Sequence, residues 1–145
     1  MNPIRILLVE DNEGDIMLTT EALRDGKISN EVFVVRDGWE AVQYLHKKEP
    51  YSNLPLPDLI LLDVNLPKMN GHEVLNEIKS QDHLRHIPVI ILTTSSSDED
   101  VLLSYRNYAS CFITKPVNVN DFISVISSIE SFWISIGTLP HSNNA

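Results

Sequence analysis

Residues 57–71, which read PDLILLDVNLPKMNG, decide the fold of this chain. Leu59 to Leu62 are apolar without interruption, which is typical of a strand buried on both faces of a parallel sheet. Asp63 follows this run, and Asn70-Gly71 makes a turn before a helical pattern. Because ligands bind outside the carboxyl ends of strands in open α/β sheets, Asp63 is a candidate site residue. On this stretch alone, a turn or helix-capping carboxylate is the alternative interpretation.

Short apolar strands and amphipathic helices alternate along the rest of the chain. The predicted strands span residues 4–9, 32–35, 59–62, 89–92 and 111–114. The predicted helices begin near Asn12, Asp37, Gly71, Asp98 and Asn118. Such alternation gives right-handed crossovers and helices on both faces of a sheet. We therefore predict an α/β fold with a doubly wound five-stranded parallel sheet in the flavodoxin-like order 2-1-3-4-5.

Length and composition indicate one domain, which we expect to span residues 1–136, with a flexible C-terminal tail over residues 137–145. The net charge of −9 argues against a nucleic-acid partner, because phosphate binding needs a basic face. The single cysteine, Cys111, forms no internal disulfide. No signal peptide is visible, and no apolar run approaches the roughly 20 residues that span a membrane. These features predict a cytoplasmic protein.

In the predicted strand order, the carboxyl ends of four strands meet at one edge of the sheet, which we call the rim. The rim carries Glu10, Asp11, Asp63, Thr93 and Lys115. Three adjacent carboxylates repel one another and stay ionised when a divalent cation lies among them. The donors are all oxygens, so we expect Mg2+ rather than Zn2+. Lys115 and Thr93 suit phosphate oxygens, and the set as a whole predicts phosphoryl transfer to Asp63.

Four motifs in this chain resemble the receiver domain of bacterial two-component response regulators over about residues 4–130: VEDN at 9–12, the run ending in LPKMNG, ILTTS at 91–95 and TKP at 114–116. The resemblance implies that a histidine kinase or a phosphotransfer protein phosphorylates Asp63. It implies that Glu10, Asp11 and Asp63 bind Mg2+ together with the backbone carbonyl of Asn65. It also implies that Thr93 contacts the phosphoryl group and that Lys115 pairs with it.

The same resemblance implies a switch formed by Thr93 and the aromatic Phe112, and a cis peptide bond before Pro116. Receivers often carry Tyr at the switch position, and Phe112 has no hydroxyl to donate. Coupling to an output through that hydroxyl is therefore not available to this chain.

A narrower likeness points to the small response regulators that are paired with bacterial phytochromes. It rests on the long loop before the 59–62 strand, on Asn65, and on the sequence ISSIESFWISIGTLP at 126–140. This likeness favours a phytochrome as the sensor kinase and a homodimer as the assembly. The candidate dimer contacts are Phe132, Trp133 and Ile136, because apolar residues continue past the predicted core. The alternative is that these side chains fold back on the core.

Two functions from other classes compete with a phosphorylation-switched module that acts by protein association. An Mg2+-dependent aspartyl phosphatase usually shows Asp-x-Asp after the first strand, where this chain has Glu10-Asp11. A nucleotide- or flavin-binding domain needs a glycine-rich loop there, and EDNEGD at 10–15 is acidic. We therefore predict a signalling module and not an enzyme, with only slow self-catalysed phosphorylation and dephosphorylation. A phosphate sink or relay intermediate is an alternative output.

Overall fold

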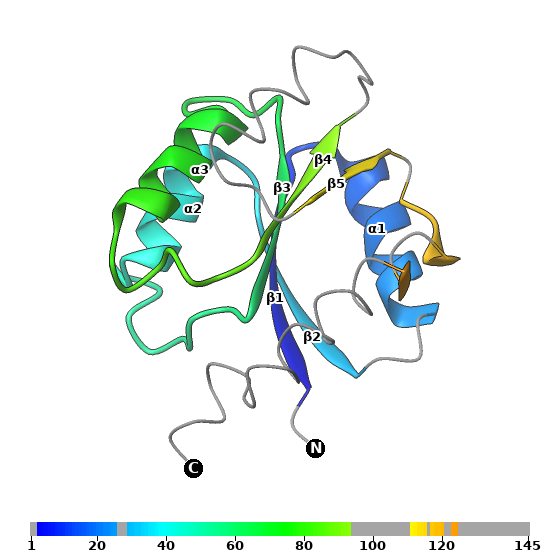
Figure 1. Ribbon diagram of the computed structural model, residues 1–145, viewed down its shortest axis with the longest axis horizontal. Helices are drawn as coiled ribbons and strands as arrows, with labels where there is room; N and C mark the ends of the chain where they lie inside the picture. Colours follow the sequence, from blue (N-terminus) through cyan, green and yellow to red (C-terminus); the bar gives the residue numbers. More distant parts are fainter. Residues whose placement is uncertain (1–2, 26–28, 94–110, 116, 121–122, 125–145) are drawn as a thin grey trace.

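Five parallel strands form one sheet in the order β2-β1-β3-β4-β5 (Figure 1), in a computed structural model that describes residues 3–25, 29–93, 111–115, 117–120 and 123–124. The strands are β1 (Ile4–Val9), β2 (Asn30–Val35), β3 (Leu59–Asp63), β4 (Val89–Thr93) and β5 (Cys111–Thr114). The helices are α1 (Glu13–Asp25), α2 (Gly38–Leu45) and α3 (Gly71–Ser80). The predicted strand order is confirmed.

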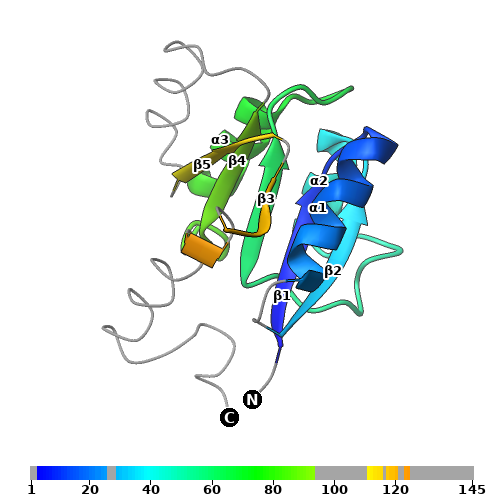
Figure 2. The ribbon, with the colours of Figure 1, turned by 90° about the vertical axis from the view of Figure 1, so that its right-hand side faces the viewer.

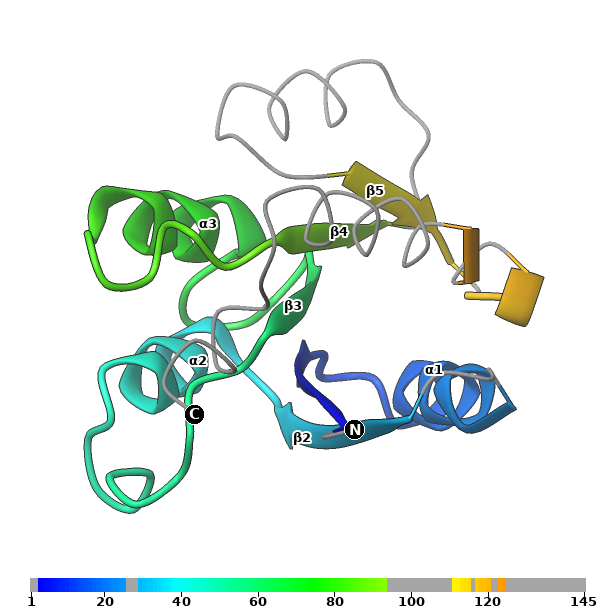
Figure 3. The same ribbon diagram turned by 60° about the horizontal axis from the view of Figure 1, so that its bottom comes forward.

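Successive side chains of the central strands point to opposite faces, which explains their uninterrupted apolar sequences. On one face Leu8 and Leu61 pack with Leu23 of α1. On the other face Leu62 packs with residues of α2 and α3, among them Leu75. Figures 1 and 3 show α1 on one side of the sheet and α2 and α3 together on the other. Figure 2 looks at the face that α1 covers.

The helix starts agree with the sequence prediction, because polar side chains cap them. The Oδ1 atoms of Asn12 and Asp37 accept hydrogen bonds from the backbone N–H groups of Asp15 and Glu40, at 2.9 and 2.7 Å. Asn70 and Glu73 form a reciprocal capping box before α3. The backbone N–H of Glu73 donates to Oδ1 of Asn70 at 2.9 Å, and the backbone N–H of Asn70 donates to Oε1 of Glu73 at 3.1 Å.

Strand β2 begins two residues earlier than predicted, because Asn30 pairs with Ile4 at the start of β1. The predicted helix after Asp98 lies outside the described residues. Of the last predicted helix, residues 119–120 and 123–124 are described and are helical. None of the described helices is both long and apolar enough to cross a membrane.

Two glycines let the loop between β3 and α3 pack closely against its neighbours. A Cβ atom on Gly71 would lie 2.3 Å from the carbonyl oxygen of Asp63. A Cβ atom on Gly38, at the start of α2, would lie 1.8 Å from the carbonyl oxygen of Met69. These contacts are far shorter than any real Cβ contact, so both positions require glycine. The loop is thereby held between the end of β3 and the start of α2.

Candidate functional site

The register of the sheet brings the strand ends to one level. Val9 pairs with Leu62, so Glu10 and Asp63 follow neighbouring positions on β1 and β3. Asp63 pairs in turn with Leu92, and the next residue on β4, Thr93, pairs with Thr114. Lys115 follows directly on β5. The rim predicted from the sequence is therefore formed by adjacent strands in register.

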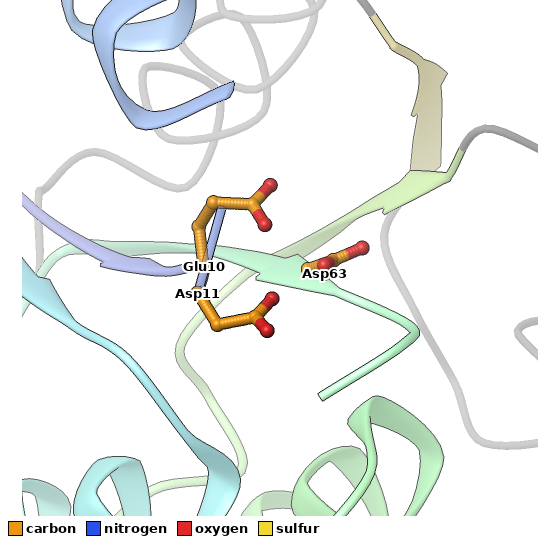
Figure 4. Close-up of side chains that lie close together, drawn as sticks. All are labelled: Glu10, Asp11 and Asp63. Carbon is orange, nitrogen blue, oxygen red and sulfur yellow. The ribbon is translucent and has the colours of Figure 1, made fainter. Parts of the chain in front are cut away.

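Three carboxylates converge at this rim, as Figure 4 shows. Glu10, Asp11 and Asp63 each offer an oxygen within 4.8 Å of the others. Glu10 and Asp63 are buried, with 0% and 4% of their surface exposed, whereas Asp11 is exposed. A hard divalent cation takes oxygen ligands and leaves room for water on its open side. The donor set and the one exposed carboxylate fit such an ion.

The ammonium group of Lys115 lies among these carboxylates. Its Nζ donates to Oε1 of Glu10 and to Oδ2 of Asp15, both at 2.9 Å, and lies 3.4 Å from Oδ1 of Asp63. Only 7% of the Lys115 side chain is exposed. A buried ammonium must be paired to persist, and here three carboxylates satisfy it.

Asp15 is the site residue that the sequence analysis missed. It lies in the first turn of α1, whereas the predicted rim contained only residues at the ends of strands. The signal was present, because Asn12 caps a helix that begins directly after the acidic pair. The first turn of such a helix lies beside the rim, and its acidic residues can face the rim's lysine.

Burial and charge shift the pKa values of Glu10 and Lys115. Burial raises the pKa of Glu10 to about 7; the hydrogen bond from Lys115 opposes this rise and the neighbouring Asp63 adds to it. Burial alone would lower the pKa of Lys115, but the hydrogen bonds to Asp15 and Glu10 and the negative charges of Asp63 and Glu10 outweigh it and raise the pKa. Lys115 therefore stays protonated, whereas the ionised form of Glu10 is destabilised by its burial.

The Glu10→Gln variant tests, in metal-free protein, how much the ionised Glu10 carboxylate destabilises the fold. Because the pKa of Glu10 rises from 4.5 to about 7 on folding, the native state keeps a proton that the unfolded state loses in this window. The stability of the wild type should therefore fall as the pH rises from about 4.5 to 7, and the glutamine variant should be spared. We expect the variant to gain about 1–3 kcal/mol over the wild type at neutral pH and almost nothing at pH 4.5. Urea unfolding in EDTA at both pH values measures this, and an equal difference at both would contradict it.

For the other predicted site residues, the structure gives the backbone position alone or no position. Thr93 ends β4 and Phe112 lies within β5, but their side chains are outside the described part of the chain. Asn65 is exposed in the loop after β3. Pro116 and the tail residues Phe132, Trp133 and Ile136 lie outside the described residues. Their predicted roles stay predictions.

Comparison with known sequences decides the family. The response regulator receiver domain matches residues 6–127. The chain belongs to this family. Receiver domains are signalling modules that bind a divalent metal at an acidic pocket, which corresponds here to the rim of the sheet.

The most similar proteins found include response regulators of phytochromes. Rcp1 of Synechocystis is 46% identical over 138 residues, which are 95% of this chain and 94% of Rcp1. A crystal structure of Rcp1 with bound Mn2+ superposes with a TM-score of 0.77, covering 95% of this chain and 99% of that one. The phosphorylated cyanobacterial phytochrome response regulator RcpA is 47% identical with a TM-score of 0.79, over 96% of this chain and 99% of RcpA. The bacteriophytochrome response regulator AtBRR is 45% identical with a TM-score of 0.81, over 92% and 96% of the two chains.

Proposed function

We propose that this receiver domain accepts a phosphoryl group on Asp63 from a sensor histidine kinase and passes the signal on by protein association. The observation that carries the proposal is the convergence of Glu10, Asp11 and Lys115 on Asp63 at the carboxyl end of the sheet. Asp63 is the member of the cluster at the end of the central strand, and Lys115 lies 3.4 Å from one of its carboxylate oxygens. The phosphorylated relative RcpA supports an acceptor aspartate in a chain of this kind.

Glu10, Asp11 and Asp63 would hold Mg2+, together with the backbone carbonyl of Asn65. The charge at the rim supports this assignment. Lys115 pairs with Glu10, Asp15 and Asp63, and Asp11 adds a further carboxylate beside Glu10 and Asp63, so that among these described residues four negative charges surround one positive charge. The Mn2+ in the Rcp1 structure supports a divalent metal in this subfamily. When bound, the cation offsets the carboxylate charge and supplies positive charge to the oxygens of the transferring phosphoryl group.

The residues of the chain would then divide the work of the transfer. A carboxylate oxygen of Asp63 attacks the phosphorus of the donor's phosphohistidine, forming a P–O bond as the P–N bond breaks. The leaving imidazole keeps the electron pair of that bond and takes up a proton. Lys115, a cation at all physiological pH values, balances the charge that arrives beside Asp63. The hydroxyl of Thr93 would donate a hydrogen bond to a phosphoryl oxygen.

The phytochrome response regulators among the relatives support a phytochrome-type histidine kinase as the donor. We place this exchange in the cytoplasm, with no role for nucleic acid or membrane. The output would pass through a homodimer that uses Phe132, Trp133 and Ile136, and the Thr93 and Phe112 pair would bias it after phosphorylation.

Phosphorylation by a small donor tests the proposed function. The wild type, incubated with Mg2+ and acetyl phosphate, should gain the mass of one phosphoryl group, and EDTA should prevent the gain. Asp11→Ala should slow the gain by at least about tenfold, because it removes the exposed metal ligand. Asp25→Ala is the control, since this carboxylate is exposed at the far end of α1 and should change nothing. An unchanged rate in EDTA, or in Asp11→Ala, would show that the rim is not the metal site.

Sedimentation tests the proposed dimer. The wild type should sediment as a dimer at a protein concentration of roughly tens of micromolar, because dimerisation is favoured as the protein concentration rises. The Phe132→Ala/Trp133→Ala variant should shift toward monomer, because it removes the two aromatic anchors. If both proteins are monomers, with and without phosphodonor, these side chains belong to the core of one chain.

A further inference from the structure

The Lys115 ammonium contacts three carboxylates at unequal distances. Its Nζ donates to Oε1 of Glu10 and to Oδ2 of Asp15, both at 2.9 Å, whereas Oδ1 of Asp63 lies 3.4 Å away. An ammonium has three N–H donors, so one of them suits Asp63 or a group bound to it. Of these three partners, Asp15 alone lies outside the group of carboxylates that could hold a metal ion. Asp15 can therefore stay bound to Lys115 when the other two partners bind a cation.

The start of α1 makes the Asp15 carboxylate available to Lys115. Asn12 caps this helix, and its Oδ1 accepts a hydrogen bond from the backbone N–H of Asp15. At α3 the cap is reciprocal, because Glu73, the third residue of that helix, accepts from the backbone N–H of its cap residue. At α1 the backbone N–H of Asn12 donates to Oε2 of Glu10 at 3.3 Å. The third residue of α1, Asp15, is thereby released from capping and binds the lysine.

Burial determines where the ammonium would go without Asp15. The Lys115 side chain is 7% exposed, whereas that of Asp15 is 28% exposed. A buried ammonium that loses a partner is destabilised, so it moves toward the carboxylates that remain. Among the described residues, those are Glu10 and Asp63. Lys115 would then close on the Asp63 oxygen that has to attack phosphorus and would occupy its lone pairs.

We propose that Asp15 is a positioning residue for phosphoryl transfer, which holds the Lys115 ammonium back from Asp63 and keeps one of its N–H groups for the arriving phosphoryl group. This inference rests on the proposed function and adds a residue to it. The carboxylate of Asp15 makes and breaks no bond to phosphorus and acts only through Lys115. Its hydrogen bond leaves the Asp63 oxygen open to the donor while the positive charge of Lys115 stays close by.

Positioning and simple charge predict rate changes of opposite sign. A carboxylate near Asp63 repels the negative phosphoryl group, so loss of the Asp15 charge by itself would speed the transfer. Loss of the hydrogen bond that holds Lys115 would slow it. The direction of the change in rate therefore tells the two effects apart, provided that Mg2+ is saturating in every measurement.

The rate of phosphorylation by acetyl phosphate at saturating Mg2+ tests the proposal. Asp15→Asn keeps the shape of the side chain and removes its charge, and it should slow the reaction by at least about tenfold. Asp15→Glu restores a carboxylate at a partly exposed position and should bring the rate back to within about threefold of the wild type. Glu13→Gln is the matched control, because it removes one charge from the same turn of α1. Glu13 is 75% exposed and pairs with Arg36, so this rate should stay within about twofold.

Urea unfolding in EDTA tests the contact without metal or phosphodonor. In protein that keeps Lys115, Asp15→Asn should lower the urea midpoint, because a buried ammonium loses a partner. In the Lys115→Met background the same change should leave the midpoint unchanged or raise it, because it removes one of several like charges. Glu13→Gln should shift the midpoint equally in both backgrounds.

Each outcome bears on a different step. An Asp15→Asn rate equal to or faster than that of Glu13→Gln overturns the proposal, as does an equal shift of the urea midpoint by Asp15→Asn in both backgrounds. If the wild type takes up no phosphoryl group while the urea midpoints show the pairing, the proposed function fails and the contact between Asp15 and Lys115 stands. If Lys115→Met fails to fold, the rates of Asp15→Asn, Asp15→Glu and Glu13→Gln still decide.

Discussion

The Asp63→Asn variant should take up no phosphoryl group from acetyl phosphate or from a cognate kinase, under conditions that phosphorylate the wild type. An amide is a poor nucleophile and cannot form the acyl phosphate, whereas its shape preserves the packing of a side chain that is only 4% exposed. We expect a loss of at least about a thousandfold in rate, which corresponds to about 4 kcal/mol in the barrier. Intact-mass spectrometry at several time points measures it.

Asp58→Asn is the matched control for this experiment. Asp58 is the other buried aspartate beside β3, with 2% of its surface exposed, and it precedes the strand where Asp63 ends it. Its Oδ2 accepts a hydrogen bond from the backbone N–H of Arg5 at 2.9 Å, which an asparagine can retain. This variant should be phosphorylated at nearly the wild-type rate. A stable phosphoryl gain at the wild-type rate in Asp63→Asn would show that another residue is the acceptor.

The Gly71→Ala variant should lose both stability and phosphorylation. Its new Cβ atom would meet the carbonyl oxygen of Asp63 at 2.3 Å and the Cα atom of Val64 at 2.8 Å. Both contacts are with backbone, so the end of β3 must move and take the carboxylate of Asp63 with it. Overpacking of a rigid core costs 1–3 kcal/mol and sometimes more, and we expect a loss of about 2–4 kcal/mol here. Urea unfolding and the phosphorylation rate should both report the change.

Gly14→Ala is the comparison for the second experiment. A Cβ atom there would meet only the side-chain oxygen of Asn12, at 3.3 Å, in an exposed part of α1. Alanine also favours the helix over glycine by roughly 0.5–1 kcal/mol, so this variant should be as stable as the wild type or slightly more so. Equal stability of Gly71→Ala and Gly14→Ala would contradict the close packing between the start of α3 and the end of β3.

The elements of this fold could be predicted from short stretches of sequence. The apolar run from Leu59 to Leu62 predicted a strand buried on both faces, and Asn12, Asp37 and Asn70 marked helix starts through their capping side chains. Strand order followed from the alternation of strands and helices, since few topologies satisfy right-handed crossovers. The position of Asp63 at a strand end followed from the same pattern. All these features depend on neighbours in sequence or on a general topological rule.

Contacts between distant segments were decided only by the tertiary structure. The capped helix after Asn12 indicated that Asp15 lies near the rim, but its contact with Lys115, 100 residues away, was set only by the folded chain. The sequence did not show that Gly38 and Gly71 make room for backbone atoms of Met69 and Asp63.

The contact between His46 and Glu77 was equally invisible in the sequence, because 31 residues separate the two side chains. The physical reason is range. Periodicity, capping and turn chemistry act over a few residues, and they fix which elements form and which face of each is apolar. The distances between side chains on different elements depend on strand register and on how closely the helices pack on the sheet. Those quantities exist only once the chain has folded.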